Sequence, residues 1–382
     1  MKLIHLSDLH LGKRVNEFSM LEDQRYILEQ ISDIMDEEAV DGVIIAGDVY
    51  DRTVPCVEAV QLFDDFLVRL SQKHRKVFII SGNHDSPERL SFGNRLMEAG
   101  GVYVSDVYDG EPQKVELHDE YGTLNVWLLP FVRPSAVKRY FPDDNINSYS
   151  DAVSVAIRHM DVDFSARNIL ISHQFVTGAS LAGSEELNVG GLDDVSFEVF
   201  DGFDYVALGH IHSAQSIGSD CIRYCGTPLK YSLSEVNDKK SVTILEIKEK
   251  GNVNVKLCGL FAKRDMYRLR GSYFNLTART YYENQPFKEG YVEIILTDEE
   301  DVPDALGKLR VIYPYIMKLG YDNTRTRISR AIEGVENVAQ KNPLELFKEL
   351  YFIQNNREMT EEQASYAEKL IENIWEEGEE TA

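Results

Sequence analysis

The chain has 382 residues, of which 43% are hydrophobic and 27% are charged, and this composition excludes a chain that is disordered throughout. With 40 Lys and Arg residues against 64 Asp and Glu residues, the formal net charge is −24. Nonspecific nucleic-acid binding depends on a surplus of cationic side chains, so a general electrostatic hold on a polyanion is also excluded. A phosphate-containing substrate would have to be attracted locally, by metal ions or by a partner.

The start of the chain and its cysteines indicate in which cellular compartment the protein is found. Three polar residues interrupt the apolar start, His5, Ser7 and Asp8, so a secretory signal is not expected. No apolar run reaches the roughly 18 residues that span a bilayer. The four cysteines are scattered and form no C-x-x-C pair, so neither a disulfide framework nor a thiolate metal cage is expected. We expect a cytoplasmic protein that does not bind membranes.

Five short apolar runs predict strands of an α/β fold, because continuous Val, Ile and Leu suit strands covered on both faces. The runs are Lys2 to Leu6, Val43 to Ala46, Val77 to Ile80, Ile169 to Ile171 and Tyr205 to Leu208. Helical spacing of apolar residues from Tyr26 to Met35 and from Val60 to Leu70 predicts two helices between the first strands. This β-α-β-α-β order predicts right-handed crossovers and a mostly parallel start to the sheet.

Polar residues follow each predicted strand. A single Asp at such a position is usually a turn former, and a single His is more often structural than a ligand. Here five of the nine histidines follow these strands, and strand ends in α/β sheets meet along one edge, where such folds place their sites. The residues that we expect to meet there are Asp8, His10, Asp48, Asn83, His84, His173, His210 and His212.

The types of these residues predict a binuclear metal site. Imidazole, carboxylate and amide oxygen without thiolate suit Mn, Fe or Zn rather than a structural zinc cage. Asp8 and His10, like His210 and His212, are two residues apart, so in an extended segment both side chains of each pair would point to the same side. The candidates are too many for one tetrahedral ion, and Asp48 stands alone between the clusters. We therefore expect two ions, about 3.5–4 Å apart, that share a carboxylate and activate water.

The motifs resemble a known signature, that of the calcineurin-like metallophosphoesterases. They are Asp8-x-His10, Gly47-Asp48-x-x-Asp51, Gly82-Asn83-His84-Asp85, His173 and Gly209-His210-x-His212. The resemblance implies a layered α/β sandwich of mixed sheets flanked by helices. It also implies that one metal is held by Asp8, His10, Asp48 and His212, and the other by Asp48, Asn83, His173 and His210.

The same resemblance assigns residues around the reaction. His84 corresponds to the catalytic histidine, which serves the scissile phosphate and the leaving oxygen. Asp51 corresponds to the acidic residue that orients this histidine in related phosphatases. Arg52 and Arg89 follow these motifs, and each is either a phosphate contact or a solvated surface residue.

Longer phrases narrow the resemblance to the nuclease subunits of bacterial ATPase–nuclease complexes that process DNA ends. These phrases are HLSDLHLGK, GDVYDR, ISGNHDSPERL, LPFVRP and LGHIHSAQ. The resemblance implies a DNA nuclease with two divalent ions, expected to be Mn²⁺. It implies 3′–5′ exonuclease action on duplex ends and endonuclease action on single strands and hairpins. It further implies a homodimer within a heterotetramer.

Beyond the metal-binding motifs the pattern changes twice. Residues 1–262 are predicted to form the nuclease domain, and residues 263–335 a small α+β capping domain with a strand from Tyr291 to Leu296 and a helix near Ala305 to Ile312. A basic run opens this region and is either a DNA contact or a charged linker face. It comprises Lys263, Arg264, Arg268 and Arg270.

Residues 336–382 are predicted to be a linker followed by a helix-loop-helix, and Thr360 with Gln363 forms a capping-box signature. Two short amphipathic helices cannot bury their apolar faces by themselves. The resemblance implies that residues 340–382 bind the ATPase subunit. The sequence has no G-x-x-x-x-G-K-[ST] phosphate loop, so any ATP dependence must come from another chain.

Two other functions compete with a DNA nuclease. A stand-alone metallophosphatase or phosphodiesterase acting on small phosphoesters would use the same site chemistry, and the acidic charge favours it. A catalytically silent scaffold is disfavoured because no position of the metal series is replaced. The capping domain and the C-terminal helices favour the nuclease, since a solitary phosphatase needs neither.

Overall fold

The computed structural model describes residues 1–181 and 194–326, together with residues 344, 347, 348, 351, 352, 359, 360, 363–367 and 370. The chain divides into two compact units, Met1–Tyr267 with Glu289–Tyr291, and Arg268–Lys288 with Val292–Ala382. Among the described residues, no helix has both the length and the apolar character needed to cross a bilayer.

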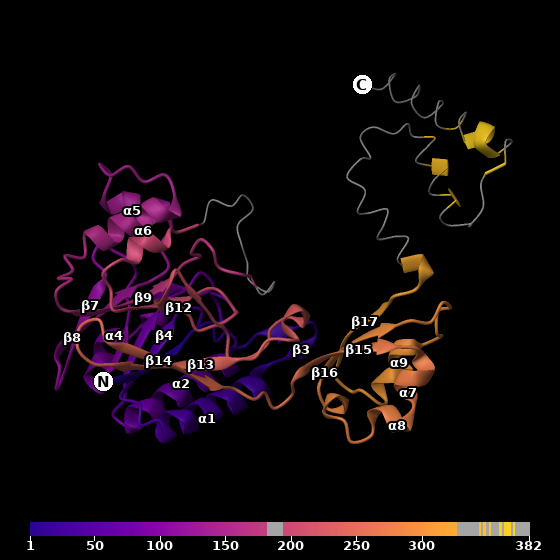
Figure 1. Ribbon diagram of the computed structural model, residues 1–382, viewed down its shortest axis with the longest axis horizontal. Coiled ribbons are helices and arrows are strands. Elements are labelled where there is room, and N and C mark those ends of the chain that lie inside the picture. Colours follow the sequence, from indigo (N-terminus) through magenta and orange to yellow (C-terminus); the bar gives the residue numbers. More distant parts are fainter. Residues whose placement is uncertain are drawn as a thin grey trace. The chain divides into compact units, whose positions relative to one another are not determined.

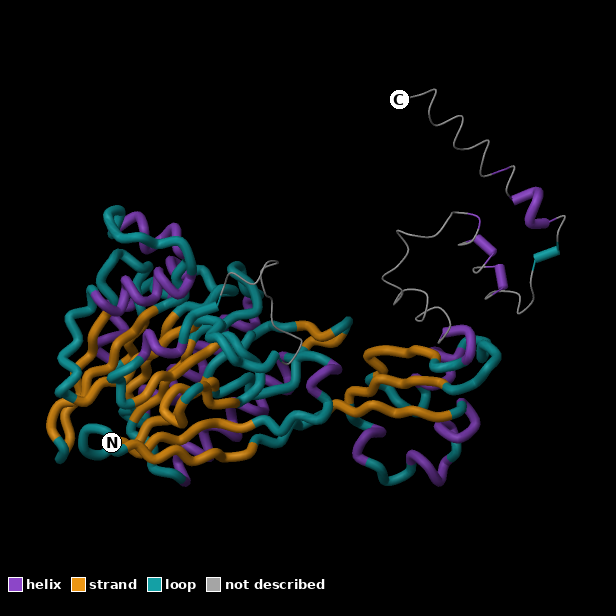
Figure 2. Tube along the Cα trace, turned by 45° about the horizontal axis from the view of Figure 1, so that its top comes forward, coloured by secondary structure: helices purple, strands orange, loops and turns teal. Residues whose placement is uncertain are grey.

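The first unit contains two six-stranded mixed sheets (Figure 2). One sheet has the order β14 (Val253–Gly259), β13 (Ser241–Ile247), β1 (Lys2–Leu6), β4 (Gly42–Ala46), β5 (Lys76–Ile80) and β6 (Val102–Val104). Strands β1, β4, β5 and β6 are parallel, and β13 and β14 add antiparallel strands at one edge. The predicted parallel start of the sheet is therefore confirmed.

The second sheet also has four parallel strands and two antiparallel ones, and it is formed by later parts of the chain. Its order is β11 (Gln215–Ile217), β12 (Ser219–Tyr224), β10 (Tyr205–Gly209), β9 (Arg167–His173), β8 (Gly122–Leu129) and β7 (Gln113–Asp119). The four inner strands are parallel, and β11 and β7 are antiparallel edges. The two sheets share one core, in which Leu3, Ile44 and Phe78 pack with Leu124, Ile169 and Tyr205.

Helices cover the outer faces of the sheets (Figure 1). On the side of the first sheet lie α1 (Leu21–Glu37) and α2 (Val57–Gln72), which contain the two predicted helical segments. On the other side lie α5 (Pro134–Tyr140) and α6 (Tyr149–Arg158), whose residues Val137 and Val153 pack on Leu170 and Val206 of the second sheet. Shorter elements are β2 (Arg14–Val15), β3 (Phe18–Ser19), α3 (Pro87–Leu90) and α4 (Asn94–Met97). The unit is the expected sandwich of mixed sheets flanked by helices.

The second unit is a small α+β structure. A three-stranded sheet, β15 (Met266–Gly271), β16 (Tyr291–Leu296) and β17 (Ile316–Tyr321), is accompanied by α7 (Tyr273–Thr277), α8 (Arg279–Tyr282) and α9 (Ala305–Arg310). Its interior includes the fully buried Tyr313, whose hydroxyl donates to the Leu276 carbonyl. The predicted strand from Tyr291 to Leu296 is β16.

The predicted C-terminal helix-loop-helix lies mostly outside the described residues. Within the described part, the backbone N–H of Thr360 donates to Gln363 Oε1 at 3.0 Å, and that of Gln363 donates to Thr360 Oγ1 at 3.3 Å. This reciprocal pair is the predicted capping box.

Candidate metal centre

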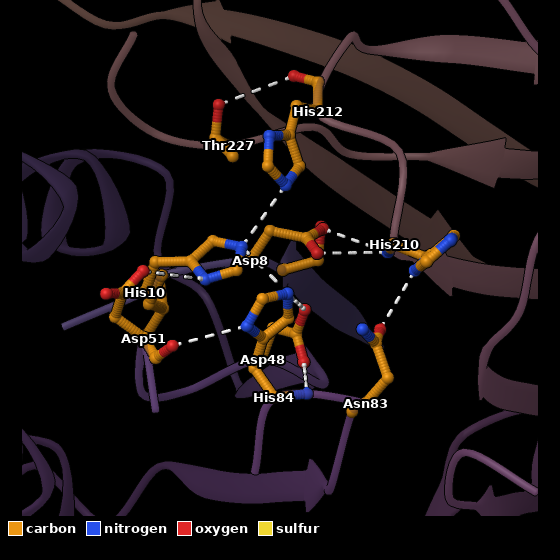
Figure 3. Close-up of polar contacts among 12 residues, drawn as sticks. Asp8, His10, Asp48, Asp51, Asn83, His84, His210, His212 and Thr227 are labelled. Atoms are coloured by element: carbon orange, nitrogen blue, oxygen red, sulfur yellow. Dashed lines mark hydrogen bonds and ion pairs between the residues drawn. The ribbon is translucent and has the colours of Figure 1, made fainter. Parts of the chain in front are cut away.

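All eight residues predicted at the sheet edge follow strands β1, β4, β5, β9 and β10 or end them, and their side chains gather in one place. Figure 3 labels all of them except His173. Three groups of these side chains have ligand atoms within 4.8 Å of one another. They are Asp8 with His10 and His212, His10 with Asp48 and His84, and Asp8 with Asp48 and His173. Each pair of groups shares at least one residue, so the atoms belong to one continuous centre.

The backbone at these strand ends is left-handed. Asp8, His10, Asp48 and His210 have φ values of 52°, 42°, 50° and 100°. Such conformations cost non-glycine residues about 1–3 kcal/mol each and concentrate at functional sites. The expectation that Asp8 and His10 share one side of an extended segment is therefore wrong, because a left-handed turn brings these side chains together instead.

Two glycines leave room for the ligand atoms. A Cβ atom on Gly82 would lie 2.1 Å from Asp48 Oδ1, and one on Gly209 would lie 1.8 Å from the Ala46 carbonyl oxygen and 2.7 Å from His173 Nδ1. Any side chain at these positions would displace Asp48 or His173. These glycines are needed for close approach and not only for turning the chain.

One half of the centre is built around a pair of imidazoles. His10 Nε2 and His212 Nε2 are 3.2 Å apart, and both rings are almost fully buried. Burial lowers the pKa of His10 to about 3, so the His10 ring is neutral near pH 7. Two nitrogens that face each other at this distance, with Asp8 beside them, suit a shared divalent cation.

The other half is built around Asn83. Its Oδ1 lies 3.0 Å from His173 Nε2 and 2.9 Å from His210 Nδ1. The opposite ring nitrogen of His173, Nδ1, lies 2.8 Å from the Ala46 carbonyl, to which it can only donate. With its proton on Nδ1, the ring would present a lone pair on Nε2 once a cation displaces the second proton, the arrangement that metal-binding histidines need.

Asp48 lies between the two halves. Its Oδ2 is 3.7 Å from His10 Nε2 and 3.4 Å from His173 Nε2. His210 and His212, which are two residues apart, serve different halves: His210 contacts Asn83, and His212 contacts His10. Asp48 therefore lies where a ligand common to two ions would be needed, and the division of the other residues into two ligand sets stays a prediction.

Ionisation at the centre follows from burial and mutual charge. Burial raises the pKa of the Asp8 carboxyl to about 7, and Asp48 adds to this shift. Burial alone would lower the pKa of His173, but the Asp48 carboxylate outweighs it and raises that pKa to about 9. Without cations the carboxylates are thus compensated by protons, which divalent ions would displace. The donor set fits two such ions.

His84 lies at the edge of the centre, with its Nε2 3.9 Å from Asp48 Oδ2. Its Nδ1 contacts the main-chain carbonyl of Asp51 at 3.2 Å and does not contact the Asp51 carboxylate. That carboxylate instead accepts a hydrogen bond from Lys13 Nζ at 2.6 Å. The structure therefore differs from the pairing that the resemblance implied, because the main chain and not the side chain of Asp51 contacts the histidine.

Several supporting residues were not predicted. Asp85 is buried and accepts hydrogen bonds from the N–H groups of Val49, Tyr50 and Gly82, so it ties the loops after β4 and β5 together. Burial raises the pKa of its carboxyl to about 6. Its place in the Gly-Asn-His-Asp motif was the only sequence signal for this role.

The turn after β1 has its own support. Gln24 Nε2 donates to the His10 carbonyl at 2.7 Å, and its Oε1 accepts from the N–H of Gly12 at 3.0 Å. Tyr231 donates from its hydroxyl to the Leu9 carbonyl at 2.5 Å. A buried glutamine in an amphipathic helix is a weak signal, and the distant Tyr231 carries none.

The basic run is neutralised by carboxylates. Within the first unit, Lys263 and Arg264 pair with Glu22 at 2.5 and 3.0 Å. Within the second unit, Arg268 pairs with Glu293 at 2.5 Å, and Arg270 pairs with Asp322 at 2.6 Å. These contacts favour the charged-face interpretation over a DNA contact.

Arg52, predicted to be either a phosphate contact or a surface residue, is 80% exposed and lies 3.8 Å from Asp51.

Two stacked mixed sheets whose strand ends gather Asp, Asn and His around one carboxylate define a class of protein, the calcineurin-like phosphoesterases. Residues 1–214 match that family, and residues 262–355 match the type 5 capsule protein repressor C-terminal domain. The chain is 35% identical over 324 residues to the SbcD component of the nuclease SbcCD from Staphylococcus epidermidis, a match that covers 84% of this chain and 85% of the relative. The chain belongs to the SbcD family within this class.

Solved structures show more remote similarity. A dimetal phosphatase from Danio rerio is 9% identical, with a TM-score of 0.38, over 68% of this chain and 96% of that one. The protein TT1561 of Thermus thermophilus is 12% identical, with a TM-score of 0.36, over 67% of this chain and 98% of that one.

Proposed function

We propose that this protein is a metal-dependent DNA nuclease that hydrolyses phosphodiester bonds and works with an SbcC-type ATPase. The observation that carries the proposal is the buried Asp48 carboxylate, which lies between the imidazoles of His10 and His173. The relationship to the SbcCD nuclease of Staphylococcus epidermidis supports DNA as the substrate. Family membership alone also supports a cytoplasmic location.

The geometry supports a set of ligands for each of two ions. Asp8, His10, Asp48 and His212 would hold one ion, and Asp48, Asn83, His173 and His210 the other. When bound, two divalent cations would neutralise phosphate oxygens and activate a water molecule. The donor set suits Mn²⁺ but also accepts Fe or Zn, and we propose Mn²⁺ as the working ion.

His84 is the side chain proposed to move a proton. Its ring is partly accessible, with 15% of the side chain exposed, whereas the aspartate and histidine ligands around it are buried. If His84 Nδ1 donates to the Asp51 carbonyl, Nε2 faces the centre. When the ring is protonated, the Nε2–H group can donate to a scissile phosphate and give its proton to the departing 3′ oxygen. The main-chain N–H of His84 donates to Asp48 Oδ1 at 2.9 Å, which fixes His84 relative to the metal ligands.

The partners are proposed from family membership, and two exposed apolar side chains support the dimer. Residues 340–382 would bind the ATPase, and DNA ends and hairpins would be the substrates, with 3′–5′ exonuclease and endonuclease action. Phe92 and Leu96, beside α3 and α4, are 86% and 83% exposed. Such exposed apolar side chains support a homodimer through the first unit, within a heterotetramer.

A direct assay separates this function from phosphatase activity on small phosphoesters. Purified protein with Mn²⁺ is incubated with end-labelled duplex and hairpin DNA, beside an aryl phosphodiester and an aryl phosphomonoester. We expect metal-dependent shortening of the DNA, and its loss in Asp48→Asn excludes a contaminating nuclease. Hydrolysis of the small esters with intact DNA would contradict the proposal and favour the phosphatase.

A further inference from the structure

The main-chain carbonyl of His212 is held from the side opposite the metal centre. It accepts hydrogen bonds from the N–H of Thr227 at 3.1 Å and from Lys240 Nζ at 3.0 Å. The Thr227 hydroxyl also lies 3.4 Å from this carbonyl, but it is only 2.7 Å from the Leu229 carbonyl. Because a hydroxyl has one proton, it donates to Leu229, and Lys240 supplies the second donor to His212.

Lys240 is not a mobile surface lysine. Its side chain is 8% exposed, and its Nζ lies 2.6 Å from Oε2 of Glu235, which is fully buried. Asp238 Oδ2 is a further 3.7 Å neighbour of the ammonium and accepts a hydrogen bond from Ser213 Oγ. A buried ammonium keeps its charge only with such partners, so Glu235 fixes both the charge and the position of Lys240.

The surroundings explain why a fixed donor matters here. A cavity of about 290 Å³ borders this loop and is lined by His212, Ser213, Thr227 and Lys240 among others. The chain around His212 is therefore not fully packed on this side. On the facing segment, a Cβ on Gly226 would lie 2.7 Å from the His212 carbonyl oxygen, so the chain approaches closely only because this residue is glycine.

We propose that Lys240, held by Glu235, is a positioning residue that fixes the ligand His212 through its carbonyl. This inference rests on the proposed two-metal centre. The hydrogen bond acts on the ligand residue itself, and it holds the backbone from which His212 Nε2 approaches His10 Nε2 to 3.2 Å. Residues that hold a metal ligand from behind commonly change metal affinity by about 10–100-fold when they are replaced.

The test is a calorimetric Mn²⁺ titration of the metal-stripped full-length chain. For Lys240→Met we expect the affinity for one of two Mn²⁺ ions to fall at least about tenfold, with the other affected much less. Lys239→Met is the matched control. Lys239 is the neighbouring residue and is exposed, and the side-chain donor to the His212 carbonyl is Lys240, so this variant should bind both ions as the unchanged protein does.

Removing Lys240 also deprives the buried Glu235 carboxylate of this cation, which could unfold the protein. The double variant Glu235→Gln with Lys240→Met removes both charges, and its thermal unfolding is measured beside its Mn²⁺ affinity. We expect the double variant to regain stability relative to Lys240→Met while its Mn²⁺ affinity stays low. A structural role for the pair would instead restore affinity together with stability.

The outcomes separate this inference from the proposed function. If the unchanged protein binds two Mn²⁺ ions and Lys240→Met binds both equally well, the positioning role is overturned and the metal centre stands. Recovery of affinity in the double variant overturns the positioning role in the same way. If the unchanged protein binds no Mn²⁺, the proposed function and this inference both fail.

Discussion

At the scale of single residues, the centre depends on main-chain contacts as much as on side chains. His84 contacts the carbonyl of Asp51, Lys240 holds the carbonyl of His212, and Gln24 holds that of His10. The left-handed backbone at Asp8, His10 and Asp48 turns each side chain toward its neighbours. Where a residue contributes only its carbonyl, as Asp51 does, we expect replacement of its side chain to have a small effect on activity.

Asp51 and His84 provide a comparison. Because the carbonyl of Asp51 makes the contact, Asp51→Asn should change kcat at saturating Mn²⁺ far less than His84→Asn, for which we expect a loss of about 10²–10⁴-fold. Steady-state hydrolysis of an aryl phosphodiester measures both, with bound Mn²⁺ counted as the control. Equal losses in the two variants would restore the carboxylate to the role that the family resemblance implied.

Gly82 tests the packing of the centre. In Gly82→Ala the new Cβ would meet Asp48 Oδ1 at 2.1 Å, so Asp48 must move and Mn²⁺ affinity should fall by at least about tenfold. Gly320→Ala is the control, since no described atom lies within 4 Å of a Cβ there. Isothermal titration calorimetry measures the Mn²⁺ affinity of both variants. Unchanged affinity in Gly82→Ala would contradict the close packing of Gly82 against Asp48.

At the scale of elements, the sequence predicted the first sheet better than the second. The strand from Val77 to Ile80 was predictable because its apolar residues are continuous. The helix around Val60 to Leu70 was predictable because its apolar residues recur every three to four positions. Most of the region from 103 to 165 was not, because β7 is an exposed edge strand and α5 is only seven residues long. Long-range contacts such as that of Tyr231 with Leu9 have no local signal.

The site was predictable to a similar depth. The residues that the structure brings together could be selected from the sequence because their motifs all follow strands. The partners that hold them from behind were missed, because a lysine such as Lys240 resembles a surface residue until the fold buries it. The Asp51 contact was misassigned for a related reason, since a motif specifies a side chain and cannot specify a main-chain carbonyl.

The edge of the second sheet yields a pH-dependent prediction. Asp119 on β7 forms two hydrogen bonds with Arg167 on β9, at 2.6 and 3.2 Å, and one with the N-terminal ammonium. The Arg167 guanidinium is the main cause that lowers the pKa of Asp119 to about 2. A lowered carboxyl pKa stabilises the fold above the unfolded-state pKa of about 4 and loses this effect as the pH falls toward 2.

Asp119→Asn should therefore lower the free energy of unfolding near neutral pH by about 1–3 kcal/mol. The gap to the unchanged protein should shrink as the pH is lowered from about 4 toward 2, across the window between the two pKa values. Urea unfolding followed by circular dichroism at several pH values measures it, and exposed Glu120→Gln serves as the control. A gap that widens with acid would contradict the assigned ion pair.

At the scale of the whole molecule, charge constrains how DNA could be held. The net charge is −24, and the basic run is paired with carboxylates within each unit. Strong attraction of duplex DNA must then come from the metal centre and from a partner. This reasoning agrees with the proposed ATPase partner.

Deleting residues 340–382 tests that division of labour. The truncated chain should no longer co-purify with the ATPase, because the predicted helix-loop-helix is its proposed binding segment. Its Mn²⁺-dependent hydrolysis of an aryl phosphodiester should be retained, since every proposed ligand lies before residue 213. Retained assembly after the deletion would refute the assignment of this segment.

The most direct test of the central claim is anomalous X-ray diffraction from crystals grown with saturating Mn²⁺. We predict two anomalous peaks about 3.5–4 Å apart. Asp8, His10 and His212 should surround one peak, Asn83, His173 and His210 the other, and Asp48 should contact both. A single peak, no peak, or two ions without Asp48 between them would contradict the account.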